Sequence, residues 1–310
     1  MKENGLLLVN LGSPRSTSVA DVRQYLAEFL GDPNVIEMPR WFWKPILHGM
    51  ILRLRPAKSA QLYREIWTDA GSPLIVHTYN LTKKVRTLLP DWEVAMAMTY
   101  GQPTIAGQIT KLQQKCHHIT VLPLFPHYSK STTKSIIDQV AAVAPNATII
   151  KRFGGDDAYI ALLVNRINQL WTAGDYDQLF VSYHGVPVSM IKRGDPYQDE
   201  TMVTSRKLQA ALTLTSDKIK FTYQSRFGPT PWLQPYLHES LVQAADAGIR
   251  KVLLACPSFT ADCLETLHEN GIENKANFLA HGGQTLDLVP ALNDDAEFAQ
   301  YIAHLVQIYK

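Results

Sequence analysis

Short apolar runs, each closed by a turn signal, alternate with longer segments of helical length along the chain. The runs are 5–11, 93–100 and 119–125 in the first half, and 178–183, 219–224 and 251–256 in the second. Runs of this length, apolar throughout and bounded by Gly or Pro, are typical of parallel strands buried on both faces. The pattern therefore predicts an α/β fold.

The two halves of the chain also resemble each other in detail. The segments 122–126 and 253–257 both end a strand in proline and lead into turns rich in Ser and Thr. We predict two similar Rossmann-like domains with parallel sheets, residues 1–155 and 156–310, and a cleft between them. Because ligands of open parallel sheets bind beyond the carboxyl ends of the strands, chemistry is expected in the segments that follow them.

The segment 36–56 does not follow this rhythm, because aromatic, aliphatic and basic residues are mixed in it. These are Trp41, Phe42, Trp43, Ile46, Leu47, Met50, Ile51 and Leu52 among Arg40, Lys44, Arg53 and Arg55. One interpretation is a helical hairpin packed on the first domain. The other is an apolar lip over a flat ligand, with weak peripheral contact to a membrane surface.

Composition narrows the class of protein. With 46% hydrophobic and 19% charged residues, the 310-residue chain has the composition of an ordinary globular protein. Its formal net charge is +2, and no segment carries the cluster of basic residues that is typical of nucleic-acid binding. The three cysteines form no CxxC pair, and the first apolar run is too short for a signal peptide, so we expect a cytoplasmic protein. No GxGxxG or P-loop motif supports a nucleotide cofactor.

His184 directly follows the strand 178–183 and precedes Gly185. At a strand's carboxyl end its imidazole can accept a proton near neutral pH or bind a metal such as Fe²⁺. A structural hydrogen bond is the alternative, and more common, role of a single histidine.

Three carboxylates follow the turn at Pro257. If an α-helix starts at Asp262, then Asp262, Glu265 and Glu269 lie on one face of it. The row is either a solvated acidic face near a helix N-terminus or a set of acid/base and metal-binding groups pointing into the cleft.

At these positions the chain resembles the ferrochelatase family over essentially its full length. The matching motifs occur in the family's order and spacing: 8–14 (LVNLGSP), 71–73 (GSP), 122–129 (LPLFPHYS), 182–187 (SYHGVP), 194–197 (GDPY), 224–233 and 262–269. The nearest resemblance is to proteobacterial-type members. The resemblance implies a lyase-type chelatase of haem biosynthesis that inserts Fe²⁺ into a porphyrin and releases two protons.

The resemblance also implies roles for single residues. His184 matches the family's catalytic histidine, Glu265 its metal-site glutamate and Asp262 the neighbouring acid. Arg55, Tyr63 and Ser72 match positions that hold propionates, Leu11 and Trp232 match contacts to the macrocycle, and Tyr128 offers a further donor. Since Lys130 replaces one cluster cysteine of animal members and the C-terminal cysteine group is missing, we expect no iron–sulfur cluster. We also expect a monomer.

The sequence favours protoporphyrin IX over the tetracarboxylate coproporphyrin III. Members that use coproporphyrin usually carry a tyrosine where this chain has Leu11, and the apolar lip suits vinyl edges. Two other functions are alternatives: a porphyrin or haem carrier, and a cobalt chelatase. The row of carboxylates disfavours a carrier, which has no use for it, and Glu265 disfavours a cobalt chelatase, because those enzymes usually have histidines at this position. Whether His184 acts as base, ligand or both, and which face of the ring admits the iron, stay open.

Overall fold

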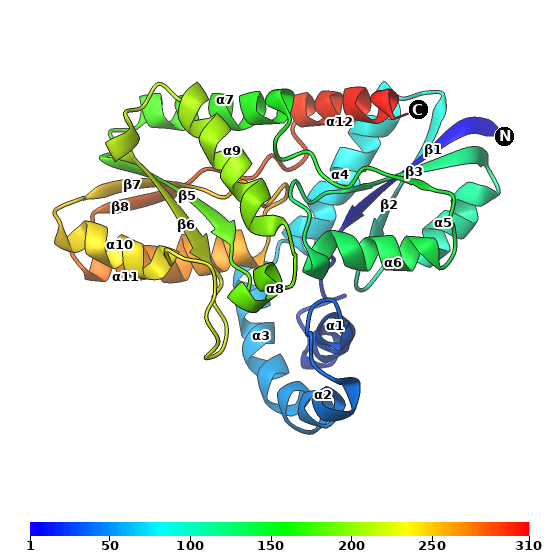
Figure 1. The fold of residues 1–310 in the computed structure, drawn as a ribbon, viewed down its shortest axis with the longest axis horizontal. Coiled ribbons are helices and arrows are strands. Elements are labelled where there is room, and N and C mark those ends of the chain that lie inside the picture. Colours follow the sequence, from blue (N-terminus) through cyan, green and yellow to red (C-terminus); the bar gives the residue numbers. More distant parts are fainter. Residues whose placement is uncertain (310) are drawn as a thin grey trace. The chain divides into compact units, whose positions relative to one another are not determined.

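Two four-stranded parallel sheets organise the chain in the computed structural model, which describes residues 1–309 (Figure 1). The first has the order β2-β1-β3-β4, and the second has the order β6-β5-β7-β8. The strands are β1 Lys2–Asn10, β2 Trp92–Met98, β3 Cys116–Pro123, β4 Thr148–Ile149, β5 Gln178–His184, β6 Ile219–Gln224, β7 Lys251–Ala255 and β8 Thr285–Leu288. The predicted α/β class with two similar parallel sheets is confirmed; the short edge strands β4 and β8 are additional to the prediction.

In the first unit, helices cover both faces of the sheet. Leu7 and Val9 of β1 pack with α5 (Ile105–Gln113) and α6 (Ser135–Ala141), because alternate residues of a strand point to opposite faces. The other face carries α4 (Pro73–Leu88) and α12 (Ala296–Ile308), which pack against each other (Figure 1). A short π-helix, η2 (Lys130–Lys134), precedes α6.

The last helix differs from the prediction. The compact units are residues 1–152 together with the chain from Asn293 onward, and Phe153–Leu292, whereas the sequence prediction placed 293–310 in the second domain. Helix α12 joins the first unit because Phe298 and Val306 are fully buried there. Asp294, just before α12, accepts hydrogen bonds of 2.8 Å from Lys84 Nζ and from Nδ1 of His77, both on α4.

The segment 36–56 belongs to a helical arm of the first unit. The arm consists of α1 (Val19–Gly31), α2 (Arg40–Ile46), the π-helix η1 (Leu47–Ile51) and α3 (Leu52–Ile66), and α3 packs on α1 (Figure 1). Trp43 is buried and its indole N–H donates to the carbonyl of Leu30 at 2.7 Å. Trp41 and Leu54 are instead 79% and 72% exposed. Among residues 1–309 no helix has the length and apolar character needed to span a bilayer.

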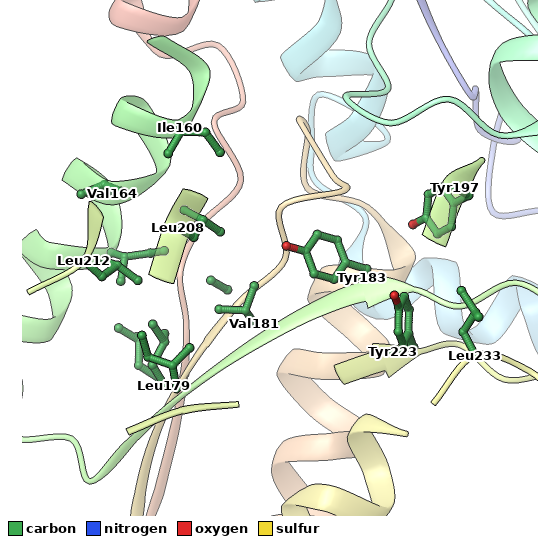
Figure 2. Packing of buried hydrophobic residues seen from close by; sticks show 14 of the residues in the cluster. Ile160, Val164, Leu179, Val181, Tyr183, Tyr197, Leu208, Leu212, Tyr223 and Leu233 are labelled. Atoms are coloured by element: carbon green, nitrogen blue, oxygen red, sulfur yellow. The ribbon is translucent and has the colours of Figure 1, made fainter. Parts of the chain in front are cut away.

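The second unit is also three-layered. On one face of its sheet, α7 (Asp157–Ala173) and α9 (Tyr197–Ala211) pack over Leu179, Val181 and Tyr183 (Figures 1 and 2). On the other face, α10 (Leu237–Asp246) and α11 (Lys275–Ala280) pack over Phe180. The remaining elements are α8 (Val188–Lys192), the 3-10 helix η3 (Ser216–Lys218) and the π-helix η4 (Glu265–Asn274). The carboxyl ends of β5, β6 and β7 thus place the segments that follow them near one another.

Candidate active site

His184 is the last residue of β5. Its neighbour Tyr183 packs into the core shared with α7 and α9 (Figure 2), so strand alternation sends His184 to the other face. The Nδ1 atom lies 2.7 Å from the carbonyl oxygen of Gly185. Because a carbonyl only accepts hydrogen bonds, Nδ1 carries the proton in the neutral ring and Nε2 keeps its lone pair. Nε2 is therefore the atom that can take a proton or bind a metal.

The main chain around His184 is held from two sides. Its N–H donates to Ser258 Oγ at 3.3 Å, and the Tyr197 hydroxyl lies 3.2 Å from the same oxygen. The N–H of Gly185 donates to the carbonyl of Gln224 at 2.8 Å. A Cβ at position 185 would also lie 2.8 Å from that carbonyl oxygen, so only glycine fits without movement.

Two aromatic rings flank the imidazole. The ring centroids of Trp232 and Phe259 lie 6.5 and 6.2 Å from that of His184. The indole Nε1 of Trp232 is buried and meets no acceptor within residues 1–309. Trp232 is predicted from the sequence, whereas Phe259 is not. The available signal was its place in the turn after Pro257, at the carboxyl end of a predicted strand.

The acidic segment after β7 forms a π-helix, and the prediction of an α-helix starting at Asp262 is wrong. Helix η4 begins at Glu265, and Asp262 lies in the loop before it. The carboxylate of Asp262 accepts hydrogen bonds from Thr266 Oγ1 at 2.9 Å and from the N–H of Ala291 at 3.4 Å. These contacts anchor the loop to the start of η4, so Asp262 does not belong to the helical row of carboxylates. Its catalytic role stays a prediction.

Glu265 and Glu269 remain neighbours on η4, because a π-helix has a wider turn than an α-helix and keeps residues four apart on one face. The Glu269 carboxylate accepts hydrogen bonds from the N–H and the Oγ of Ser225, at 2.7 and 2.5 Å. Burial raises the pKa of Glu269 and the charge of Glu265 adds to the rise, while the Ser225 hydrogen bonds and His184 oppose it. Electrostatically, His184, Glu265 and Glu269 therefore form one group.

Ser225 was not proposed from sequence. It directly follows β6 and has a φ of 64°, a conformation that costs energy for any residue other than glycine. The two hydrogen bonds to Glu269 hold it there. No sequence signal marks a strained serine, although its place at a strand end was known.

Buried thiols lie beside the carboxylates. The Cys263 thiol hydrogen-bonds to the side chain of Glu265; burial raises the pKa of this thiol well above its usual value, and the glutamate adds to the rise. Burial also raises the pKa of Cys256, with the charges of Asp262 and Glu269 acting in the same direction. Both thiols are therefore protonated and serve as hydrogen-bonding groups.

Two of the proposed porphyrin-binding residues of the first unit belong to the arm. Arg55 is exposed on α3, and Tyr63 is buried about two turns further along the same helix. The Tyr63 ring makes edge-on contacts with Tyr25 and Trp67, with centroids 6.4 and 6.2 Å apart. Tyr63 is thus part of the packing between α1 and α3.

The other three follow strands or begin helices. Leu11 is half-buried after β1, and its N–H donates to Asn10 Oδ1 at 2.8 Å. Ser72 is buried at the N-terminal cap of α4. Tyr128 is half-buried, with the guanidinium of Arg152 at 5.8 Å from its ring centroid.

The part of the chain described here holds no cluster of three or more His, Cys, Asp or Glu side chains arranged to bind a metal. His184 and Glu265 as metal ligands, and Leu11, Arg55, Tyr63, Ser72, Tyr128 and Trp232 as porphyrin contacts, stay predictions.

Comparison with known proteins places the chain in a family. The sequence profile of the ferrochelatases matches residues 3–309. The chain is 52% identical to the coproporphyrin III ferrochelatase of Limosilactobacillus reuteri (strain DSM 20016) over 307 residues, 99% of each chain. It is 44% identical to the enzyme of the same name from Lactococcus lactis subsp. lactis (strain IL1403), over 98% of each chain.

Solved structures show the same fold at much lower sequence identity. The sirohydrochlorin chelatase SirB of Bacillus subtilis subspecies spizizenii in complex with cobalt superposes with a TM-score of 0.54 at 12% identity, over 98% of this chain and 93% of that one. SirB from Bacillus subtilis with Fe³⁺ gives a TM-score of 0.52 at 13% identity, over 98% and 94%. With the family profile spanning nearly every residue and relatives this similar along their whole length, the chain belongs to the ferrochelatase family of metal-chelating enzymes.

Proposed function

We propose that the enzyme inserts Fe²⁺ into coproporphyrin III to form coprohaem. The observation that carries the proposal is the 44–52% identity, over nearly the whole chain, to relatives named coproporphyrin III ferrochelatase. This choice replaces the preference for protoporphyrin IX drawn from Leu11 and the apolar arm. The narrower resemblance to proteobacterial-type members stays a prediction.

The arm itself does not require a ring with apolar edges. Exposed basic side chains accompany its exposed apolar ones, and Arg53, Arg55 and Lys58 all lie on the surface of α3. A propionate that ends in solvent beside such side chains avoids the several kcal/mol that burying an unpaired carboxylate would cost. The two additional propionates are therefore only a weak reason to exclude coproporphyrin as the substrate.

The reaction exchanges one Fe²⁺ for the two pyrrole N–H protons, so the enzyme needs a proton acceptor beside the ring nitrogens. We assign this role to Nε2 of His184, the unprotonated nitrogen of the neutral ring. Glu269 lies near enough to His184 to stabilise the imidazolium that forms, and Glu265 interacts with Glu269. Either carboxylate can also help to bring Fe²⁺ to the ring, since hard oxygen ligands and imidazole both suit this ion.

The remaining predictions complete the proposal. Fe²⁺ is a substrate, and no iron–sulfur cluster or other resident cofactor is needed. We propose that Arg55, Tyr63, Ser72 and Tyr128 hold propionates, that Leu11 and Trp232 contact the macrocycle, and that the enzyme is a cytoplasmic monomer. Exposed Trp41 and Leu54 on the arm support weak, reversible contact with a membrane surface.

A competition assay tests the choice of porphyrin. Coproporphyrin III and protoporphyrin IX at equal concentration are given to limiting enzyme with anaerobic Fe²⁺, and the ratio of metallated products gives the ratio of kcat/KM. We expect at least about a tenfold preference for coproporphyrin, or about 1.4 kcal/mol. A preference for protoporphyrin would restore the sequence-based choice, and binding without metallation of either ring would indicate a carrier.

A further inference from the structure

A buried cluster of side-chain amides lies between η4 and the end of β6. We name it the amide cluster: Gln224, Asn270 and Asn274, together with the thiol of Cys256. The three amides are 0–5% exposed. The Cys256 side chain packs against the apolar cluster that α10 and α11 form on this face of the sheet. Polar groups in such a place need a full set of partners, because a buried amide without hydrogen bonds costs free energy.

The hydrogen bonds of the amide cluster run in one direction. Asn274 Nδ2 donates to Asn270 Oδ1 at 2.9 Å, and Asn270 Nδ2 donates to Gln224 Oε1 at 2.9 Å. The Gln224 amide is thereby oriented, so that its Nε2 donates to the main-chain carbonyl of Glu265 at 3.1 Å. The chain of amides thus ends on the first residue of η4.

The Cys256 thiol reinforces this orientation. Its sulfur accepts a hydrogen bond from Asn270 Nδ2 at 3.2 Å and lies 3.5 Å from Gln224 Oε1, to which it can donate. Because burial keeps this thiol protonated, its S–H can satisfy the second lone pair of the Gln224 oxygen. Turning the Gln224 amide over would place its NH₂ group against the NH₂ group of Asn270, so only one orientation satisfies the cluster.

Gln224 also touches the other side of the site. Its main-chain carbonyl accepts the N–H of Gly185, the residue whose own carbonyl orients the His184 ring. One residue therefore holds the histidine through its main chain and the π-helix through its side chain. The next residue, Ser225, holds Glu269.

We infer that Gln224, oriented by Asn270, is the positioning residue that fixes Glu265 relative to His184. Glu265 and Glu269 each directly precede a buried residue of η4, namely Thr266 and Asn270. If the buried side of η4 is held in place, the two glutamates therefore point in a fixed direction. A long π-helix is an uncommon conformation that rarely extends beyond a single turn, and it needs such external bonds. The inference deepens the proposed function and rests on it, since it takes Glu265 and His184 to be the reacting groups.

Two substitutions distinguish the two side-chain hydrogen bonds of Gln224, the one that it accepts from Asn270 and the one that it donates to Glu265. Gln224→Glu keeps the acceptor for Asn270 and loses the donor to Glu265, whereas Gln224→Met loses both. We expect each to lower kcat at least about tenfold while the porphyrin KM changes less than about threefold, because geometry and not binding is affected. Gln243→Glu, on the exposed side of α10, makes the same chemical change outside the amide cluster and should leave kcat unchanged. Wild-type kcat in Gln224→Glu would overturn the inference.

A double-mutant cycle distinguishes positioning of Glu265 from a general effect on folding. If Gln224 acts through Glu265, then Gln224→Glu should lower kcat by a much smaller factor in the Glu265→Gln background than in the wild type. Factors that multiply in full would show that Gln224 acts elsewhere, and would overturn the inference. All variants are assayed with whichever porphyrin the wild type metallates, so the choice of ring does not affect the result.

Hydrogen exchange gives a readout that is independent of turnover. Gln224→Met should accelerate amide exchange selectively in η4, while exchange in α10 stays as in the wild type. Unchanged exchange in η4 would overturn the inference even if activity fell. If the wild type metallates no porphyrin, the proposed function fails while this structural measurement still reports on the amide cluster.

Discussion

At the scale of single residues, His184 is the side chain whose loss should cost most activity. Its Nε2 is the only nitrogen of the ring left to accept a proton, because Nδ1–H is directed at the Gly185 carbonyl. We expect His184→Ala to abolish iron insertion and to leave the melting temperature nearly unchanged, since the side chain is only half-buried. His118→Ala, an exposed histidine beside Glu3, serves as the control. More than about a tenth of wild-type turnover, a loss below roughly 1.4 kcal/mol, would contradict the proposed role.

Substitutions of the two glutamates should lower turnover to different extents. Glu265→Gln keeps the volume and removes the charge, and should lower kcat by about 10²-fold, the scale of lost acid/base catalysis. Glu269→Gln should lower kcat less, because the Glu269 carboxylate is already engaged by the two Ser225 hydrogen bonds. Steady-state kinetics of both variants check this. If neither variant loses turnover, the carboxylates have no part in the reaction.

At the scale of elements, the arm combines buried and exposed tryptophans that should respond in opposite ways. Trp41→Ser with Leu54→Ser should reduce flotation with anionic vesicles and leave stability unchanged, because both side chains lie mostly in solvent. Trp43→Ser should instead cost about 3–5 kcal/mol of stability, the scale of a large aromatic removed from a core. Equal vesicle binding by the wild type and the Trp41/Leu54 variant would show that the arm makes no membrane contact.

The attachment of α12 to the first unit should depend on pH through Asp294. Burial alone would raise its pKa, but hydrogen bonds from Lys84 and His77 outweigh burial and lower the pKa below the usual 3.8. A lowered pKa means that the carboxylate contributes stability above about pH 4 and loses it as the pH falls through the folded-state value. We expect Asp294→Asn to cost about 1 kcal/mol at pH 6, a modest figure because Lys84 is largely exposed.

This cost should shrink as the pH falls below the usual aspartate value and disappear once the wild-type carboxylate is protonated. Urea unfolding across a pH series measures it, with exposed Asp91→Asn as the control. The same loss of stability throughout the series would mean that Asp294 contributes through its shape and not through its charge.

At the scale of the whole molecule, hydrophobic runs predicted both sheets because the strands are buried on two faces and therefore apolar throughout. The position of His184 followed directly from this. Helix η4 was missed because the spacing of Glu265 and Glu269 suits an α-helix almost as well as a π-helix. This helix is also held by hydrogen bonds from residues distant in sequence, such as the one from Gln224 to the Glu265 carbonyl, and spacing alone does not reveal such bonds. Helix α12 was misplaced for a similar reason, since an apolar helical stripe does not reveal which sheet it will cover.

The protonated state of the buried cysteines affects how such an enzyme withstands oxidation in the presence of ferrous iron. Ferrous iron exposed to oxygen leads to peroxide, and peroxide oxidises a cysteine through its accessible thiolate. Burial raises the pKa of Cys116, Cys256 and Cys263 alike, so each thiol keeps its proton at neutral pH. A protein that handles a redox-active metal thus holds its sulfur in the form least open to oxidation by peroxide.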